Sequence, residues 1–418
     1  MSSVSPCLTT VRGHDAGAVM MGSSTLSRLA RVAVLAAGIG ATSVASSQQA
    51  ASAGASTGSA AHVDLAAALK EYQLQEYGTP VRELVPGWTA PKKLIVTVDN
   101  PERTAWLQQV MPKGVTVIGV RKESEAEPHL ADADALIASG CRAGTIAKAP
   151  KLKWIHAGGG GSDQCLAIPA VASGKILMTN NQKVKNGVLA EMAMGYVLAL
   201  SRSIDVSMLN QARGELNVPG GRPAKQLEGS TMLVIGLGGA GTEIARIAHS
   251  FGMKVIATRN SSREGPDFVS YVGLPDETAR LVGQADVVVI CAPLTPATRG
   301  LFDAAMFSRM KKDAILVNWT RAELTVPEDL AAALKAGTIG SAALNWATSA
   351  PLPKTHPLWG APNLILAPWA GTGGGAEANR ANRSDESNEM RWLVVRENMR
   401  RFAAGDKMYS VFDLARGY

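Results

Sequence analysis

The sequence has few cysteines, and this shortage limits the kinds of site it can carry. It contains four cysteines in 418 residues. No two of them form the C-x-x-C pair typical of zinc sites, and no histidines cluster near them, so we expect no metal site. Cys141 and Cys165 could pair in an oxidising compartment, but their spacing alone does not establish a disulfide.

Charged residues and long apolar runs are also scarce. Charged residues make up 18% of the chain, and the formal net charge is +7. The lysines and arginines are scattered and form no basic run interleaved with aromatic residues, so we expect a solvated surface and no nucleic-acid site. The apolar run at residues 32–41 is too short to span a bilayer, and we expect no membrane association of the mature protein. What the chain does have is 46% hydrophobic residues, enough for a substantial core, and a length typical of two or three domains.

The first 60 residues have the pattern of a secretory signal followed by a low-complexity linker. Arg28 and Arg31 precede the apolar run, and small residues suited to a signal peptidase follow at 43–45 and 51–53. The two arginines are not adjacent, so this is not a twin-arginine signal. Residues 46–60 are rich in Ala, Ser, Gly and Gln, as flexible linkers are. We expect an exported, periplasmic protein; the alternative is a cytoplasmic protein with an extension that has no targeting role.

Beyond the linker, short apolar runs alternate with helical patterns. The expected strands lie at residues 93–98, 115–120, 135–138, 154–157 and 176–179, and the expected helices at 61–76, 101–111 and 186–205. This alternation predicts an α/β domain with a parallel sheet covered on both faces. A final helix at 376–403 is expected to return to it, so we assign residues 61–211 and 376–418 to a first, substrate-binding domain.

A glycine-rich turn organises the second domain, which we assign to residues 212–375. An apolar run at 231–235 leads into Gly236, Gly238 and Gly241, and a helical pattern follows. In this context the first glycine permits the turn, the second lets a pyrophosphate approach and the third lets the helix pack closely, with its N–H groups free to bind phosphate. Gly239 and Ala240 complete the loop. The turn predicts dinucleotide binding rather than a merely structural glycine turn, and the expected strands are 232–236, 254–258, 286–291, 314–318, 340–344 and 363–366.

The end of the second strand of this domain indicates which dinucleotide is bound. NAD-specific sites carry a carboxylate there for the ribose hydroxyl. Here the segment contains none and instead offers Arg259, Asn260, Ser261 and Arg263. A guanidinium suits phosphate, so the sequence favours NADP, with NAD as the alternative. In the competing interpretation Arg259 stacks on adenine and Arg263 faces solvent. Further cofactor contacts are expected from Ala292, Pro293, Thr298 and Asn318.

Further motifs occur along the chain at residues 152–163, Glu191, 236–241, 291–295, 316–321, 351–353 and 356–359. With these motifs, the chain from about residue 90 to 415 resembles the D-isomer-specific 2-hydroxyacid dehydrogenase family. The resemblance implies two doubly wound parallel-sheet domains, one flavodoxin-like and one Rossmann, usually in a dimer. It also implies hydride transfer between a nicotinamide and a small-molecule 2-oxo acid.

The resemblance breaks at two of the three side chains that the family's chemistry needs. Arg321 matches the arginine that binds the substrate carboxylate and polarises the carbonyl. Ala350 stands where the family has a glutamate, and Trp369 stands where it has the proton-donating histidine. An indole cannot supply that proton near neutral pH.

Other side chains are therefore candidates for the altered site. The glycines Gly159, Gly160 and Gly161 offer backbone N–H groups to an anion. His156 precedes them and is a candidate proton donor, against the plainer interpretation of a core histidine. Lys183 and Lys185 are further candidates for the proton donor, against the plainer interpretation of surface lysines. His356 belongs to a turn that is structural in the family. Trp346 and Trp369, with Trp319, indicate either an aromatic substrate pocket or core packing.

Three hypotheses follow from these residues. The first is an NAD(P)-dependent oxidoreductase that prefers NADP, acts on a carbonyl or hydroxy compound, aromatic ones included, and has a non-standard proton donor. The second is a catalytically degenerate exported protein of the same fold that binds a nucleotide or another ligand. The third is a lyase or isomerase that uses a bound nucleotide without net redox turnover.

Overall fold

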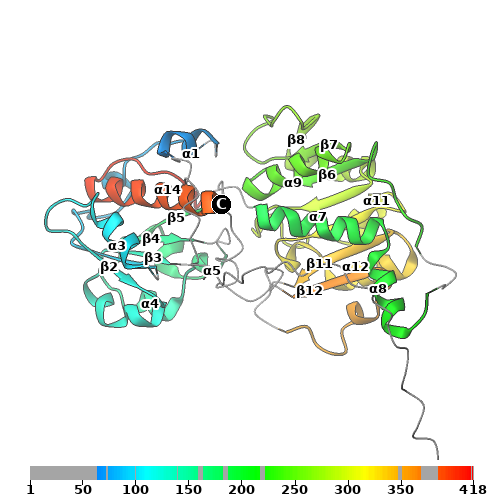
Figure 1. The fold of residues 1–418 in the computed structure, drawn as a ribbon, viewed down its shortest axis with the longest axis horizontal. Helices are drawn as coiled ribbons and strands as arrows, with labels where there is room; N and C mark the ends of the chain where they lie inside the picture. Colours follow the sequence, from blue (N-terminus) through cyan, green and yellow to red (C-terminus); the bar gives the residue numbers. More distant parts are fainter. Residues whose placement is uncertain are drawn as a thin grey trace, which may run out of the picture. The chain divides into compact units, whose positions relative to one another are not determined.

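A computed structural model describes residues 64–71, 74–98, 100–138, 140–158, 163–181, 187–216, 222–346, 351–368, 385–415 and 417. The expected signal and linker lie outside these residues. The described chain contains a five-stranded and a seven-stranded sheet, each with its own helices (Figure 1). All pairings between the named strands are parallel, which confirms the α/β fold class expected from the alternation of strands and helices.

The five-stranded sheet has the order β2-β1-β3-β4-β5. Its strands are β1 (Lys93–Thr97), β2 (Thr116–Val120), β3 (Ala135–Ala138), β4 (Trp154–Ala157) and β5 (Leu177–Asn180). The last three are buried along their whole length, as expected for strands covered on both faces. Its helices are α1 (Leu65–Glu71), α2 (Val81–Leu84), α3 (Pro101–Gln108), η1 (Glu123–Asp132), α4 (Ala143–Ala147), α5 (Asp163–Leu166) and α6 (Pro169–Ala172), with α14 (Asp385–Ala404) from the end of the chain.

Helix α14 covers one face of this sheet. Val395, Met399 and Phe402 are buried in the same core as β1, and the Phe402 ring lies 5.0 Å from that of Trp154 in β4. Arg103 in α3 pairs with Glu389 in α14 and lies over the ring of Trp106. The C-terminal helix is therefore fixed to the sheet by apolar packing and by a charged contact between segments almost 300 residues apart.

The seven-stranded sheet has the order β12-β11-β10-β9-β6-β7-β8. Its strands are β6 (Thr231–Ile235), β7 (Lys254–Thr258), β8 (Tyr271–Gly273), β9 (Val287–Ile290), β10 (Ile315–Asn318), β11 (Ser341–Trp346) and β12 (Leu364–Pro368). The helical elements after β6 are α9 (Gly239–Ser250), η2 (Pro275–Glu277), α10 (Thr278–Leu281), η3 (Val282–Gln284), α11 (Ala304–Arg309), η4 (Ala322–Leu324), α12 (Pro327–Ala336) and η5 (Pro357–Gly360). Six strands match the predicted ones; β8 is too short to give a sequence pattern. The strand order reverses at β6, which pairs with β7 on one side and β9 on the other, and such a switch point opens the crevice where nucleotides bind.

Two helices lie on the other side of the expected domain boundary. The helix α7 (Gly187–Ser201) packs on α9, and its Met194 and Val197 are buried in the same core as β6. The helix α8 (Ile204–Arg213) follows and packs on α7. The sequence analysis placed residues up to 211 with the first sheet. The apolar side chains of α7 instead complete the core of the seven-stranded sheet, so this boundary is corrected to the segment before α7.

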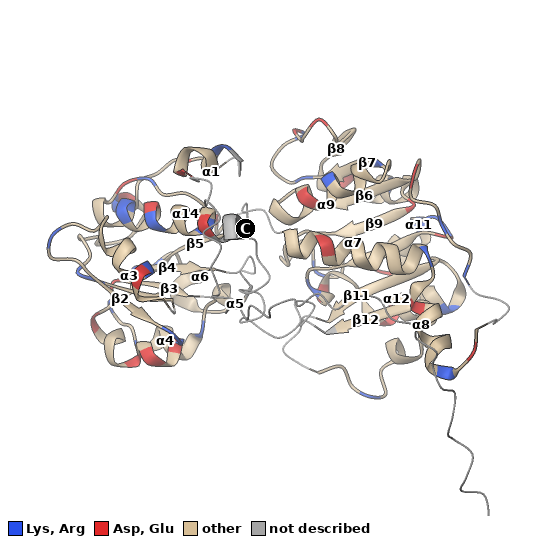
Figure 2. Ribbon diagram, viewed as in Figure 1, with Lys and Arg blue, Asp and Glu red and all other residues tan. Residues whose placement is uncertain are grey.

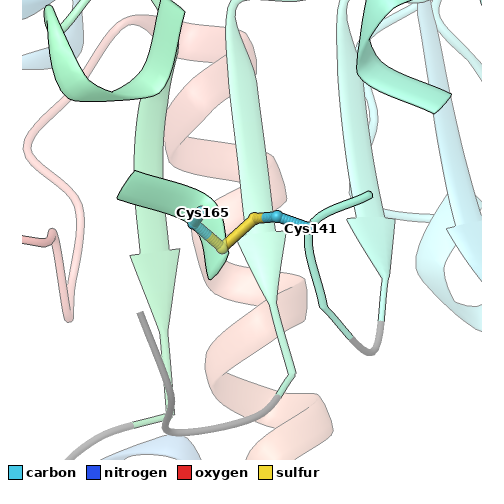
Figure 3. The surroundings of a disulfide bond; sticks show 2 residues. All are labelled: Cys141 and Cys165. Atoms are coloured by element: carbon cyan, nitrogen blue, oxygen red, sulfur yellow. A yellow bond between two sulfur atoms is a disulfide. The ribbon is translucent and has the colours of Figure 1, made fainter. Parts of the chain in front are cut away.

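A disulfide joins Cys141, just after β3, to Cys165 in α5 (Figure 3). Both cysteines are buried, and their Cα atoms lie 5.0 Å apart. The pairing left open by the sequence is therefore present in the structure.

Figure 2 shows basic and acidic residues interspersed along the elements of both sheets. Among the described helices no single one is long and apolar enough to cross a membrane. Helices α7 and α8, which are bent against each other, reach that length and composition only when they are taken together.

Candidate active site

The glycine turn between β6 and α9 has the geometry of a dinucleotide-binding loop. Gly236 has a φ of +100°, and a Cβ there would lie 3.0 Å from the backbone of Cys291 and of Ala292. A Cβ on Gly241 would lie 1.9 Å from the carbonyl oxygen of Gly236. Gly238 precedes the first residue of α9 in an extended conformation. The loop is therefore a tight turn with no room for a Cβ at Gly236 or Gly241, and it leads directly into α9, whose first turn has the free N–H groups that a pyrophosphate requires.

The loop after β9 lies beside this turn and is held by its own hydrogen bonds. Ala292 is buried against Gly236. The Thr298 hydroxyl donates to the Pro293 carbonyl at 2.7 Å and accepts from the Thr295 N–H at 2.8 Å. Burial raises the pKa of the neighbouring Cys291 to about 12, so its thiol stays protonated. The expected cofactor residues Ala292, Pro293 and Thr298 therefore belong to one hydrogen-bonded loop, which contacts the glycine turn through Ala292.

The carboxyl end of β7 carries the cationic residues expected to select the cofactor. The Arg259 guanidinium donates to Ser261 Oγ at 3.0 Å and to the Glu264 carbonyl at 3.1 Å. Within the described part of the chain it forms no ion pair. Arg259 therefore remains available to an anion, and Ser261 helps to hold it; Asn260 lies between them.

Arg263 has a different environment. It lies 2.6 Å from Glu277, which also receives hydrogen bonds from Tyr271 and Arg280. The Tyr271 hydroxyl, the Leu274 N–H and Arg280 together lower the pKa of Glu277 to about 2. The charge of Arg263 is thus already compensated. The sequence allowed two interpretations of Arg263, phosphate binding and exposure to solvent, and neither describes it fully. Arg263 does not simply face solvent, and it is less available to phosphate than Arg259.

Arg321 and Asn318 lie at the carboxyl end of β10. Asn318 is buried, and its amide donates to the Arg321 carbonyl at 2.8 Å and to Thr325 Oγ1 at 2.9 Å. It also accepts from the Thr320 N–H at 3.3 Å. Asn318 therefore fixes the loop that carries Arg321, and this use of its amide does not favour the direct cofactor contact expected from sequence. Arg321 is half-buried at the start of η4.

The tryptophans near Arg321 have different roles. Trp319 is 3% exposed and packs 5.7 Å from the ring of Tyr196, so it belongs to the core. Trp346 is half-buried at the end of β11, with its ring 6.1 Å from that of His356. His356 accepts from the Leu358 N–H and begins η5, the structural role expected of it. Trp369, Ala350, Lys183, Lys185 and the glycines Gly159 to Gly161 lie outside the described residues.

His156 does not fit the role of proton donor. It is 1% exposed within β4, and its Nδ1 atom lies 2.9 Å from the Thr179 hydroxyl. Burial is the main cause that lowers its pKa to about 4. A buried imidazole that is neutral at pH 7 cannot deliver a proton to a substrate, so the interpretation as a core histidine replaces the catalytic one. No group of three or more metal-binding side chains occurs in the part of the chain that the structure describes.

Comparisons with known proteins agree with this geometry. Residues 194–371 match the family described as D-isomer specific 2-hydroxyacid dehydrogenase, NAD binding domain. A glycerate dehydrogenase of Methylorubrum extorquens is 34% identical over 240 residues, which are 55% of this chain and 73% of that protein. A glyoxylate reductase of Korarchaeum cryptofilum is 30% identical over 264 residues, which are 62% of this chain and 75% of that protein.

Solved structures show the same two-sheet fold. A D-isomer specific 2-hydroxyacid dehydrogenase family protein from Aeromonas salmonicida superposes with a TM-score of 0.62 at 27% identity, covering 78% of this chain and all of that one. An NADPH-dependent glyoxylate/hydroxypyruvate reductase from Sinorhizobium meliloti, in complex with NADP and sulfate, has a TM-score of 0.61 at 22% identity and covers 78% of this chain and all of that one.

The fold and the glycine turn define an NAD(P)-dependent oxidoreductase with a Rossmann domain. The chain belongs to the D-isomer-specific 2-hydroxyacid dehydrogenase family.

Proposed function

We propose that the protein is an oxidoreductase that prefers NADP and acts on a carbonyl or hydroxy compound, with a proton donor other than the family's histidine. The observation that carries this proposal is the cationic end of β7. Arg259 is held there by Ser261, and no carboxylate occurs between residues 257 and 263. Such a site attracts the 2′-phosphate that distinguishes NADP from NAD. The NADP complex of the Sinorhizobium meliloti enzyme, which shares the fold, is consistent with it.

Different residues of the chain have different roles in the reduction of the carbonyl. NADPH, when bound, supplies the hydride that reduces the carbonyl carbon. The first turn of α9 binds the pyrophosphate, and Arg321 binds the substrate carboxylate and polarises the carbonyl. An arginine stays protonated and His156 is buried and neutral, so the proton for the carbonyl oxygen comes from another group. Lys183 and Lys185 are the candidates from sequence. Trp346 adds an aromatic ring that suits an aromatic substrate.

Steady-state kinetics with NADPH and NADH on a panel of 2-oxo acids tests the function. The panel includes glyoxylate, hydroxypyruvate and phenylpyruvate. We expect turnover with NADPH, and a loss of about 1,000-fold in kcat/KM in Arg321→Ala, because a bidentate charged contact is removed. Undiminished activity of Arg321→Ala would exclude its role as carboxylate clamp. Tight NADPH binding without turnover on the panel would instead support a nucleotide-binding protein.

A charge reversal tests the cofactor preference. In Arg259→Asp we expect the ratio of kcat/KM for NADPH over NADH to fall about 100-fold, because the carboxylate repels the 2′-phosphate and accepts from a ribose hydroxyl. Arg263→Gln is the matched control with a smaller effect, since Glu277 already compensates that charge. An unchanged ratio in Arg259→Asp would refute the NADP assignment.

We also propose that the mature protein is exported. The signal pattern before residue 60 and the buried Cys141–Cys165 disulfide support this, because structural disulfides persist in oxidising compartments. Cell fractionation of the full-length chain, with cleavage mapped by N-terminal sequencing, tests it. Recovery in the cytoplasm with an intact N-terminus would contradict export.

We propose that two copies of the chain form a homodimer through helix α8. Ile204, Met208 and Leu209 on this helix are 46%, 67% and 57% exposed, an apolar surface that solvent does not favour. A second copy of the chain would cover it. Light scattering should give a dimer for the wild type and a monomer for the Met208→Glu, Leu209→Glu variant; a monomeric wild type would refute the assembly.

A further inference from the structure

Four hydrogen-bond donors converge on the carboxylate of Glu277, the last residue of η2. Its Oε2 atom accepts from Arg263 at 2.6 Å and from the Leu274 N–H at 2.9 Å. Its Oε1 atom accepts from the Tyr271 hydroxyl and from Arg280, the latter at 2.6 Å. A carboxylate has about four lone-pair sites. The four donors occupy them, so Glu277 is not available to a further partner such as a ribose hydroxyl.

Polar contacts, and not close packing, hold Arg263 in this cluster. Besides Glu277, its guanidinium contacts the Tyr271 hydroxyl, to which it donates at 3.2 Å. The Arg263 side chain is 54% exposed, and it lines a hollow of about 520 Å³ beside β8. Space is therefore present for another rotamer of this long side chain, and the charge of Glu277 is the main reason for the observed one.

Arg263 belongs to the same loop as Arg259, the cation that the proposed function assigns to the 2′-phosphate. The Arg259 guanidinium donates at 3.1 Å to the carbonyl of Glu264, the residue directly after Arg263. The backbone next to Arg263 thus contacts the guanidinium of Arg259. A phosphate group has three acceptor oxygens and can bind two guanidinium groups at once.

We propose that Glu277 is a positioning residue for Arg263 and limits the preference for NADP by holding that arginine away from the 2′-phosphate. The sequence has no carboxylate between residues 257 and 263, and the fold brings one to Arg263 from η2. Glu277 acts through Arg263, because its own oxygens are occupied. This inference rests on the proposed function, in which Arg259 binds the 2′-phosphate.

The competing role for Glu277 is that of an anchor for the loop, and the two roles predict opposite changes in affinity. Loss of an anchor would weaken the binding of NADPH, whereas release of Arg263 would strengthen it. The contacts of Arg259 favour release. Its side chain is held by Ser261 and by the Glu264 carbonyl, and its N–H donates to the Gly273 carbonyl at 2.9 Å. None of these three bonds involves Glu277.

Calorimetric titrations of Glu277→Gln test the sign of the effect. We expect the Kd for NADPH to fall about fivefold, the upper range for an exposed ion pair, and the Kd for NADH, which lacks the phosphate, to change less than about twofold. The gain should disappear in the double variant Glu277→Gln, Arg263→Gln. It should also shrink as the salt concentration is raised, because exposed charges are screened. Glutamine has the same shape and still accepts from the Leu274 N–H, so the melting temperature should change little.

Glu228→Gln is the matched control. It removes one negative charge from the same unit, but Glu228 is exposed and lies before β6, at the end of the strand opposite to the glycine turn. The Kd for NADPH should equal that of the wild type. An equal gain in Glu228→Gln would show a general effect of net charge and overturn the proposal. A weaker or unchanged affinity for NADPH in Glu277→Gln, or a gain that persists without Arg263, would overturn it as well.

Titrations with 2′,5′-ADP and 5′-ADP separate this inference from the proposed function. These probes differ by the 2′-phosphate and need no turnover. If Arg259→Asp discriminates between them as the wild type does, the proposed function fails. A gain for 2′,5′-ADP in Glu277→Gln that depends on Arg263 would still support the role of Glu277. If Arg259→Asp loses the discrimination and Glu277→Gln shows no gain, the inference alone fails.

Discussion

The carboxyl edges of the two sheets are shaped by different kinds of feature. At the carboxyl edge of the seven-stranded sheet the decisive features are positions without a side chain: Gly236 and Gly241 leave no room for a Cβ. At the carboxyl edge of the five-stranded sheet the decisive features are side chains that are buried and paired, such as His156 with Thr179 and the Cys141–Cys165 disulfide. The edge of the seven-stranded sheet is therefore shaped by the absence of side chains, and the edge of the five-stranded sheet by hydrogen bonds and a covalent bond.

This difference explains which half keeps the features of its family. A glycine turn binds the phosphates that every dinucleotide shares, so its backbone geometry is independent of the substrate. The substrate half must fit one particular molecule, and its restraints are made by individual side chains. The sequence predicts that Ala350 and Trp369 stand at the positions of the family's glutamate and histidine, and such replacements are changes of this second kind. Binding of the cofactor and the identity of the reaction are therefore separable properties of this chain.

The largest expected effect on the affinity for the cofactor comes from adding one methyl group to the glycine turn. In Gly241→Ala the Cβ would lie 1.9 Å from the Gly236 carbonyl oxygen, so the backbone of the turn must move. We expect the Kd for NADPH, measured by calorimetry, to rise about 100-fold, which corresponds to about 3 kcal/mol and the upper range of overpacking costs.

Gly195→Ala is the control for this substitution. Gly195 also lies within a helix, α7, but a Cβ there has nothing within 4 Å. Since alanine favours helix more than glycine does, the variant should bind NADPH normally and be slightly more stable. Equal affinities of the two variants for NADPH would contradict the role assigned to the glycine turn.

The sequence predicted the nucleotide half well because its signals are local. The apolar run, the three glycines and the helix lie within some twenty consecutive residues, and six of the strands found in this sheet were expected. The predicted boundary at residue 211 failed because α7 is apolar on several sides, and its sequence does not show which sheet it covers.

The substrate half was less predictable because its interactions join distant residues. The Cys141–Cys165 pairing depends on how the segment after β3 approaches α5. The role of His156 depends on Thr179, its partner in the next strand. A histidine just before a glycine run looks the same in sequence whether it faces a substrate or the core. Similarly, the compensation of Arg263 by Glu277 required the register of β8.

The second prediction concerns the covalent restraint of the five-stranded unit. Replacing both Cys141 and Cys165 by serine should lower the free energy of unfolding by about 3 kcal/mol, the value for a closed loop of this size. Urea denaturation followed by tryptophan fluorescence measures it. The Kd for NADPH should be unchanged, since both cysteines are buried in a core of the five-stranded sheet.

The reduced wild-type protein is the matched comparison. In dithiothreitol its midpoint in urea should fall to that of the double variant, whereas the variant should not respond to the reductant. A wild type that is equally stable with and without dithiothreitol, once mass spectrometry confirms reduction, would show that the disulfide does not restrain this half.

The smallest expected effect is a pH dependence that comes from the buried imidazole of the same half. The pKa of His156 is 6.5 in an unfolded chain and about 4 in the fold. Between these values the unfolded chain binds more protons, so the free energy of unfolding falls as the pH is lowered. From pH 7.5 to 5 the loss should be about 2 kcal/mol. Glu277, with a pKa lowered from 4.5 to about 2, loses its contribution only at lower pH. Urea titrations at several pH values should show a shallower pH dependence in His156→Gln, and identical slopes would mean that His156 is already accessible to protons in the folded protein.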